Sequence, residues 1–205
     1  MFYNILDKKR KEILPLLKEF KNDFYLAGGT GLALQIGHRD SIDFDFFTKN
    51  DIDTEKLFQK IKKIFENYQI QKIQDEKNTL TVIINNDIKL SFFTYDYKIL
   101  DDFIEDENLK IASIKDIAAM KISAIMSRST EKDYIDLYFI FQNNSLNDVL
   151  FWTQEKFNNT LSEPLILKSL VYFDDIISEP INFKNNKNTK FEDIKKFLVN
   201  LIKQK

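Results

Sequence analysis

One stretch of the sequence, FYLAGGTGLALQIGHRDSIDFDFF (residues 24–47), places the tightest limits on what the chain can fold into. Its first four residues are apolar and predict a short buried strand, and Gly28-Gly29 directly after them predicts a tight turn. Thr30 is a residue type that caps helices, and the apolar run behind it predicts a helix to about residue 36. IDFDFF (residues 42–47) then predicts a second strand. A strand, a turn, a helix and a strand in this order predict a mixed α/β structure.

Asp43 and Asp45 are separated by one residue in the second of these strands. Their side chains should share one face of the strand, with Cα atoms about 7 Å apart, while Phe44 and Phe46 pack on the other face. Two carboxylates this close repel each other, and a divalent cation removes the repulsion. Mg²⁺ or Mn²⁺ accepts such oxygen ligands and shares its coordination with phosphate. The pair therefore predicts a metal site, and the alternative is a plain solvated strand face.

The glycine turn predicts a phosphate site next to the metal. At a junction of strand, Gly-Gly and helix, backbone N–H groups can approach an anion without an intervening Cβ. We therefore expect Gly28, Gly29 and Thr30 to bind phosphate. Together with the aspartate pair, this predicts a nucleoside triphosphate as ligand, and positioning of its phosphates is most of what nucleotidyl transfer requires.

The pattern of the remaining chain changes near residue 100. Before it, we expect a helix over residues 5–20, a helix from 53 or 54 to 65, and three strands around 68–73, 79–84 and 88–95. After it, helical spacing dominates, over residues 113–128, 131–142, 145–157, 163–173 and 190–203. This predicts an α/β (α+β) domain with a mixed sheet and flanking helices over residues 1–100, followed by a helical domain over 101–205.

The composition excludes several classes of protein. The net charge of −2 argues against a general nucleic-acid binder, and the absence of cysteine excludes thiolate nucleophiles and disulfides. No apolar run approaches the roughly 18 residues that cross a bilayer, and the first residues do not have the pattern of a signal peptide, so we expect a cytoplasmic location and no membrane. His38, the single histidine, is expected as a polar turn residue.

A second constellation falls in the expected helical half. Lys121 lies on the apolar stripe of the helix over 113–128, and Arg128 continues the same face. Asp136 has apolar neighbours in the next helix and should be substantially buried. One interpretation is a structural ion pair between Lys121 and Asp136 that ties two helices together. The other is that Lys121 reaches the triphosphate while Asp136 orients it.

These residues carry a family resemblance. Gly28-Gly29, thirteen residues and Asp43-Phe44-Asp45 resemble the signature of nucleotidyltransferases of the DNA polymerase beta superfamily. The longer string LAGGTGLALQIGHRDSIDFDFF is similar to abortive-infection toxins of the AbiEii/AbiGii type, and the likeness continues in IKLSFFTYDY, IASIKDIAAMKISAI and RSTEKDYIDLYFI. The resemblance implies a nucleotidyltransferase fold, catalytic roles for Lys121 and Asp136, and metal-dependent transfer of a nucleotide to tRNA, another RNA or a protein. It also implies the toxin of a bacterial toxin–antitoxin or phage-defence pair, whose antitoxin is a separate transcriptional regulator.

The sequence departs from the superfamily pattern at one position. Many members carry a third carboxylate on a later strand, and the matching strand here, IKLSFF, has Ser91 at that position. Asp87 and Asp96 lie only at the ends of that strand. Two interpretations stay open: a slow or specialised transferase, or a catalytically idle nucleotide-binding or partner-binding module of the same fold. A Rossmann oxidoreductase, which GGTGLA resembles locally, is a more distant alternative because no further βαβ unit follows.

Overall fold

A seven-stranded mixed sheet is the frame of the computed structural model, which describes residues 1–205. The strand order is β3-β4-β5-β2-β1-β7-β6. The central strand β2 pairs parallel with β5 and antiparallel with β1. The strands are β1 (Tyr25–Ala27), β2 (Phe44–Thr48), β3 (Ile70–Glu76), β4 (Thr79–Ile84), β5 (Ile88–Thr94), β6 (Ile104–Glu105) and β7 (Lys110–Ile111).

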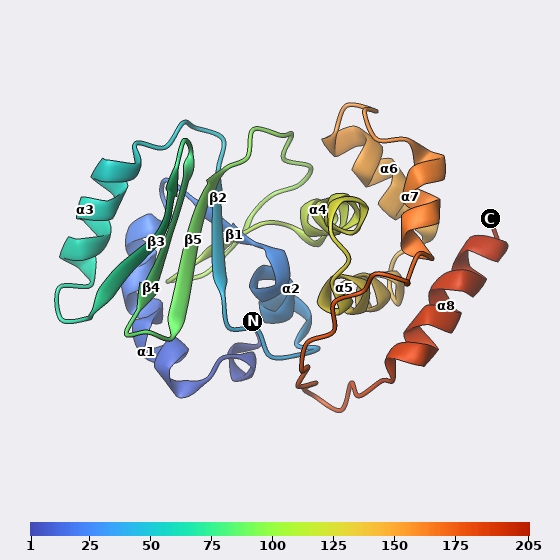
Figure 1. Cartoon of the computed structure of the whole chain (residues 1–205), viewed down its shortest axis with the longest axis horizontal. Coiled ribbons are helices and arrows are strands. Elements are labelled where there is room, and N and C mark those ends of the chain that lie inside the picture. Colours follow the sequence, from blue (N-terminus) through green and yellow to red (C-terminus); the bar gives the residue numbers. More distant parts are fainter.

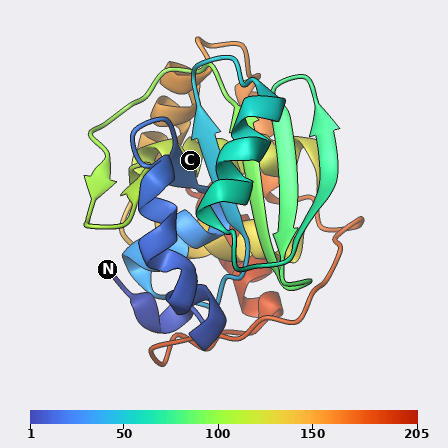
Figure 2. The ribbon, with the colours of Figure 1, turned by 90° about the vertical axis from the view of Figure 1, so that its left-hand side faces the viewer.

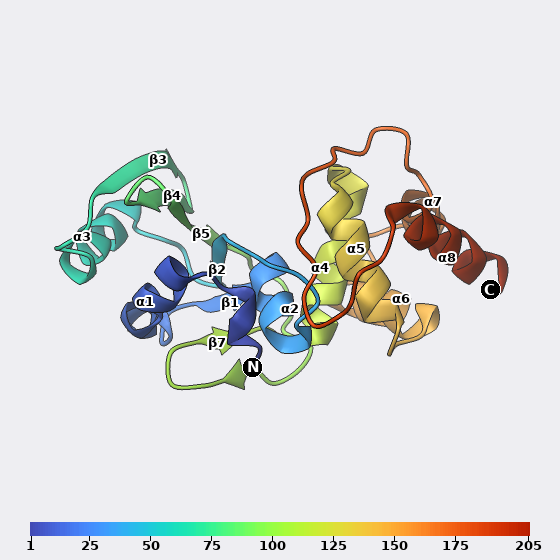
Figure 3. The ribbon, with the colours of Figure 1, turned by 90° about the horizontal axis from the view of Figure 1, so that it is seen from below.

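Helices cover one face of this sheet and form a separate layer beyond its other face (Figures 1 and 3). Figure 2 shows α1 and α3 in front of the strands, whereas α4 to α8 lie on the far side. The helices are α1 (Lys8–Leu17), α2 (Gly28–Ile36), α3 (Thr54–Ile64), α4 (Ile114–Ser127), α5 (Glu131–Phe141), α6 (Leu146–Lys156), α7 (Glu163–Leu170) and α8 (Phe191–Lys203). Short 3₁₀ turns, η1 (Tyr3–Ile5) and η2 (Lys18–Phe20), flank α1. None of the helices combines the length and the apolarity that crossing a membrane requires.

Strand β2 separates a packed face from a polar one, as its alternating sequence predicts. Phe44 and Phe46 are buried in a hydrophobic cluster with side chains of α1 and α3. The rings of Phe46 and Phe92 stack there with centroids 5.2 Å apart. A second cluster joins α2 to the helices of the C-terminal half. Because the phenylalanines anchor β2 on one side, the aspartates that alternate with them are fixed on the other.

The expected α/β fold class is confirmed, with differences at several elements. The first helix is shorter than expected, because two 3₁₀ turns replace its ends and Pro15 lies inside α1. Strands β6 and β7 were not expected; they follow residue 100 and extend the sheet, with Ile111 pairing parallel to Leu26. The helix at the glycine turn begins at Gly28, so the prediction that Thr30 caps it was wrong.

Residues 177–187, here called the strap, run from the C-terminal helices back to the N-terminal half. At one end the N–H of Ile177 donates to the carbonyl of Ser129, over 2.8 Å, before α5 begins. Farther along, the N–H of Lys184 donates to the carbonyl of His38, over 2.9 Å, in the loop before β2. The strap therefore connects both halves of the molecule by backbone hydrogen bonds.

Candidate active site

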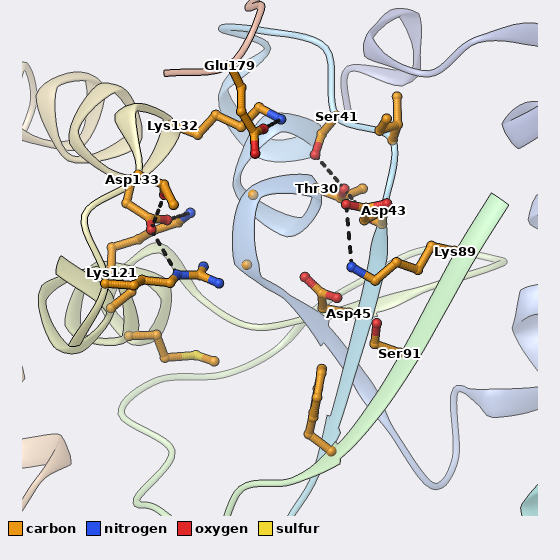
Figure 4. A pocket seen from close by; sticks show the side chains of 18 of the residues that line it. Thr30, Ser41, Asp43, Asp45, Lys89, Ser91, Lys121, Lys132, Asp133 and Glu179 are labelled. Carbon is orange, nitrogen blue, oxygen red and sulfur yellow. Dashed lines mark hydrogen bonds and ion pairs between the residues drawn. The ribbon is translucent and has the colours of Figure 1, made fainter. Parts of the chain in front are cut away.

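A cleft of about 1060 Å³ lies between the polar face of the sheet and helices α4 and α5. Figure 4 shows its two sides: Asp43, Asp45 and Ser91 on the strands, and Lys121 and Asp133 on the helices. The strap contributes part of the rim. The predicted site residues that line the cleft are Gly28, Gly29, Thr30, Asp43, Asp45, Lys121 and Arg128. Asp136 is the predicted site residue that does not.

The aspartate pair faces the cleft with few partners of its own. Asp45 lies in β2, and Asp43 directly precedes the strand with 45% of its side chain exposed. The nearest cation is Lys89 on β5, whose Nζ is 3.9 Å from an Oδ of Asp43. Partial burial raises the pKa of Asp45, and the negative charge of Asp43 acts in the same direction, while Lys89 opposes it. The pair is thus left with unbalanced negative charge.

The chemistry of this pair fits a divalent cation. Both groups are hard oxygen donors on one strand face, and the only ion-pair partner of the two, Lys89, is 3.9 Å from Asp43. A cation that binds there would favour the ionised form of Asp45, whose pKa is raised by burial and by the charge of Asp43. Nowhere in the chain do three or more acidic, histidine or cysteine side chains gather into a larger metal-binding group. A cation would therefore have to complete its coordination with ligand oxygens or water.

The first glycine brings the start of α2 against the aspartate pair. Gly28 has a φ of +65°, a conformation that side chains disfavour, and a Cβ there would lie 3.2 Å from an Oδ of Asp45. Residue Ala27 before it gives no side-chain cap, so protein side chains leave the first N–H groups of α2 free. The hydroxyl of Thr30 instead donates to the carbonyl of Asp43 and lies 2.7 Å from the hydroxyl of Ser41. Thr30 therefore fixes the loop that carries the aspartates.

The second glycine makes room for an arginine that the sequence analysis did not identify. A Cβ on Gly29 would lie 2.5 Å from Nη2 of Arg39. The guanidinium of Arg39 is buried at the cleft floor and donates from Nε and Nη2 to the two oxygens of Asp136, over 2.8 and 2.9 Å. Arg39 directly follows His38 in the sequence, but its partner Asp136 is 97 residues away.

Asp136 is a buried junction of charges behind the wall of the cleft. Its side chain has no exposure, and besides Arg39 it contacts Nε2 of His38 at 2.7 Å and Nζ of Lys121 at 2.5 Å. Burial acts to raise its pKa, but Arg39 and Lys121 outweigh burial and hold the pKa well below the ordinary value. The expectation of His38 as a polar turn residue was wrong: the ring is fully buried, because its Nε2 bonds to Asp136.

Lys121 contacts two acids and also reaches the cleft. Its Nζ is 2.7 Å from Asp133 as well as 2.5 Å from Asp136. Burial disfavours the charged amine, yet these two carboxylates raise its pKa. Arg128 contacts Asp133 through Nε at 3.2 Å, and 65% of its side chain is exposed. The predicted ion pair of Lys121 with Asp136 is thus present, within a larger network that includes Asp133.

Comparison with known proteins identifies the class to which this fold belongs. MenT4, a nucleotidyltransferase toxin of Mycobacterium tuberculosis H37Rv, matches with a TM-score of 0.60 over 95% of this chain and 82% of its own, at 14% identity. JHP933 from Helicobacter pylori matches with a TM-score of 0.59 over 97% of this chain and 92% of its own, at 18% identity. The fold is that of the nucleotidyltransferases.

The family follows from the sequence. The family model of the nucleotidyl transferase AbiEii toxin, of type IV toxin–antitoxin systems, matches residues 16–202, and the chain belongs to this family of nucleotidyltransferases. The uncharacterized protein aq_aa25 of Aquifex aeolicus (strain VF5) is 37% identical over 182 residues, which are 85% of this chain and 86% of that protein. The family resemblance is thereby confirmed. The Rossmann alternative was wrong, because β1 and β2 on either side of α2 are antiparallel.

Proposed function

We propose that this nucleotidyltransferase transfers a nucleotide from a nucleoside triphosphate to an acceptor, with Mg²⁺ or Mn²⁺ held by Asp43 and Asp45. The observation that carries the proposal is the contact between the unbalanced carboxylate of Asp45 and the start of α2 at Gly28. A metal-binding pair and an anion-binding helix end then adjoin at one point of the cleft. A bound cation would neutralise charge on the phosphates and on the leaving group.

The chain's own residues would orient the triphosphate. The N–H groups of Gly28, Gly29 and Thr30, which no side chain caps, would donate to phosphate oxygens. Lys121 and Arg128 present positive charge from the opposite wall. Because two acids already fix the Lys121 amine, it needs no reorganisation when phosphate charge develops. Asp136 would be a positioning residue, since it contacts Lys121 and does not reach the cleft.

The acceptor and the biological role rest on the family. Family membership supports a toxin whose antitoxin is a separate protein, and an RNA acceptor such as tRNA. We place this activity in the cytoplasm, as part of a phage-defence system.

One observation favours a second candidate function. Ser91 pairs with Asp45 in the register of β2 and β5, so the expected position of a third carboxylate is a serine in the structure as well. A site without that carboxylate could bind a nucleotide without transferring it. The alternative is therefore an idle nucleotide-binding module of the same fold.

Incubation of the protein with α-labelled nucleoside triphosphates, total RNA and Mg²⁺ tests the proposal. Wild type should label an acceptor, EDTA should abolish labelling, and Asp45→Asn should lower it by about 10²–10³-fold. Asp51→Asn, an exposed aspartate outside the cleft, is the matched control and should behave as wild type. If no triphosphate labels any acceptor although the protein binds nucleotide, the idle module is correct. Labelling that persists in Asp45→Asn would contradict the proposed metal site at Asp43 and Asp45.

A further inference from the structure

Asp45 in β2 and Asp43 directly before it have different neighbours on β5. The register pairs Asp45 with Ser91 and Phe44 with Leu90, so Lys89, the residue before Leu90, lies level with Asp43. Lys89 and Ser91 alternate with the buried Leu90 and share the cleft face with the aspartates. A third acid on β5 would add negative charge beside the two aspartates. Strand β5 instead presents the cation Lys89 and the neutral hydroxyl of Ser91 there (Figure 4).

We propose that Lys89 supplies the positive charge that a second divalent cation would supply in a site with three carboxylates. The chain then binds one divalent cation per bound triphosphate instead of two. This inference rests on the proposed function, because it concerns the same aspartate pair and the same ligand.

The charges of the group support a single cation. Asp43 and Asp45 carry two negative charges when ionised, and Lys89 at 3.9 Å neutralises half of that charge. One divalent cation already makes the group positive before the nucleotide enters. A second cation about 3.5–4 Å from the first would have to bind to a positive group with the phosphates as its main compensation.

The row of residues level with Asp45 holds no acid that could replace the missing one. The row of residues paired across the sheet from Asp45 continues through Ser91 and Thr81 to Gln74, and all three are neutral. Thr81 and Gln74 are already hydrogen-bonded to each other, with the Thr81 hydroxyl donating to Oε1 of Gln74 over 3.2 Å. The hydroxyl of Ser91 is buried, with 1% residue exposure, and has no hydrogen-bond partner. A lone neutral hydroxyl beside Asp45 does not hold a second divalent cation in place of a carboxylate.

The position of Lys89 suits a mobile counter-charge. At 3.9 Å its contact with Asp43 is longer than a hydrogen bond, and 42% of its side chain is exposed. The amine can therefore move away from Asp43 when a metal binds. Its charge still stays near the site, because the backbone of β5 is held between β2 and β4.

Counting bound Mn²⁺ by electron paramagnetic resonance tests the inference with a readout other than activity. The protein is titrated with Mn²⁺ with and without a non-hydrolysable triphosphate analogue, whose binding is followed separately. We expect one Mn²⁺ per chain in wild type with the analogue. The double variant Lys89→Met/Ser91→Asp, which removes the cation and adds the third carboxylate, should bind two. Lys49→Met, an exposed lysine just beyond the other end of β2, is the control and should bind one.

A single variant covers the case in which a buried aspartate at position 91 prevents folding. Lys89→Met should bind Mn²⁺ without nucleotide roughly tenfold more tightly than wild type, because it removes one positive charge beside the ion. Unchanged or weaker binding would overturn the role of Lys89, as would a folded double variant that binds a single ion.

The outcomes for wild type separate this inference from the proposed function. Two Mn²⁺ ions in wild type would overturn the single-cation inference and leave the nucleotidyltransferase proposal standing. Binding of the analogue with no Mn²⁺ at all would overturn both, because the aspartate pair would then not be a metal site.

Discussion

The acidic side chains on the two walls of the cleft differ in how far nearby cations compensate their charge. On the sheet wall, Asp43 and Asp45 have a single cation nearby, at 3.9 Å, and the pKa of Asp45 is raised by burial. On the helix wall, Asp136 has three partners within 2.8 Å, and its pKa is well below the ordinary value despite burial. The carboxylates of the sheet wall therefore lack sufficient cationic partners, whereas those of the helix wall are compensated by cations of the protein.

This difference separates binding from support. Charges that are already compensated hold the fold and fix the position of neighbouring groups, but they gain little from a ligand. Charges without compensation destabilise the free protein and are relieved when a ligand of opposite sign binds. The comparison therefore predicts that changes on the helix wall act first on stability, and that changes on the sheet wall act first on ligand binding.

The difference between the two walls should be largest at Asp136. Asp136→Asn removes the charge that compensates Arg39 and Lys121, which leaves two buried cations without their common partner. We expect a loss of about 3–5 kcal/mol in the free energy of unfolding, measured by urea denaturation. Asp43→Asn on the sheet wall, the matched control, should change it by less than about 0.5 kcal/mol. Equal effects at the two positions would show that the walls do not differ.

Lys121 belongs to the helix wall and also lines the cleft, so a change there should affect both stability and ligand binding. Lys121→Met leaves Asp133 with Arg128, and Asp136 with Arg39 and His38, so each acid keeps a partner. We expect a smaller loss of stability, about 1–3 kcal/mol, together with weaker binding of a triphosphate analogue. Denaturation and calorimetric titration of the same variant measure the two effects. Intact analogue binding would restrict Lys121 to a structural role.

The smallest effect concerns Asp45 in the metal-free protein. Because its pKa is raised on folding, the group stabilises the fold below its unfolded pKa of about 3.8 and loses that contribution as the pH rises through the folded pKa. Asp45→Asn, which cannot ionise, should therefore be more stable than wild type at neutral pH, and the difference should vanish below about pH 4. Thermal melts across this range measure it. Addition of Mg²⁺ should close the gap at neutral pH by stabilising wild type alone, and a gap that ignores Mg²⁺ would contradict metal binding at Asp45.

The sheet wall was the part of the site that the sequence predicts best. Its signal is local: in β2 the apolar Phe44 and Phe46 alternate with the aspartates, and the period of a strand alone assigns the two faces. The superfamily pattern of a third carboxylate identified Ser91 on the later strand before its pairing with Asp45 was known. Such alternation along one strand can be recognised in a single sequence without any knowledge of the tertiary structure.

What the sequence could not predict depends on contacts between distant segments. Arg39 and His38 reach Asp136 across 97 and 98 residues, and nothing beside them in the sequence marks that partner. Strands β6 and β7 have two residues each in an acidic stretch, and pairing of Ile111 with Leu26 places them in the sheet. Thr30 follows a general capping preference in the sequence, but its hydroxyl is already used by the carbonyl of Asp43.

The strap determines when, during synthesis, the cleft becomes complete. All other residues that line the cleft belong to the first 133 positions, whereas the strap adds residues 179–182 to its rim. At translation rates on the order of 5–20 residues per second, the residues of both walls are synthesised a few seconds before this segment. Until then the nascent chain lacks the backbone bonds that join Ile177 to Ser129 and Lys184 to His38. A newly made chain thus completes the cleft only after the strap has been synthesised and has packed against both walls.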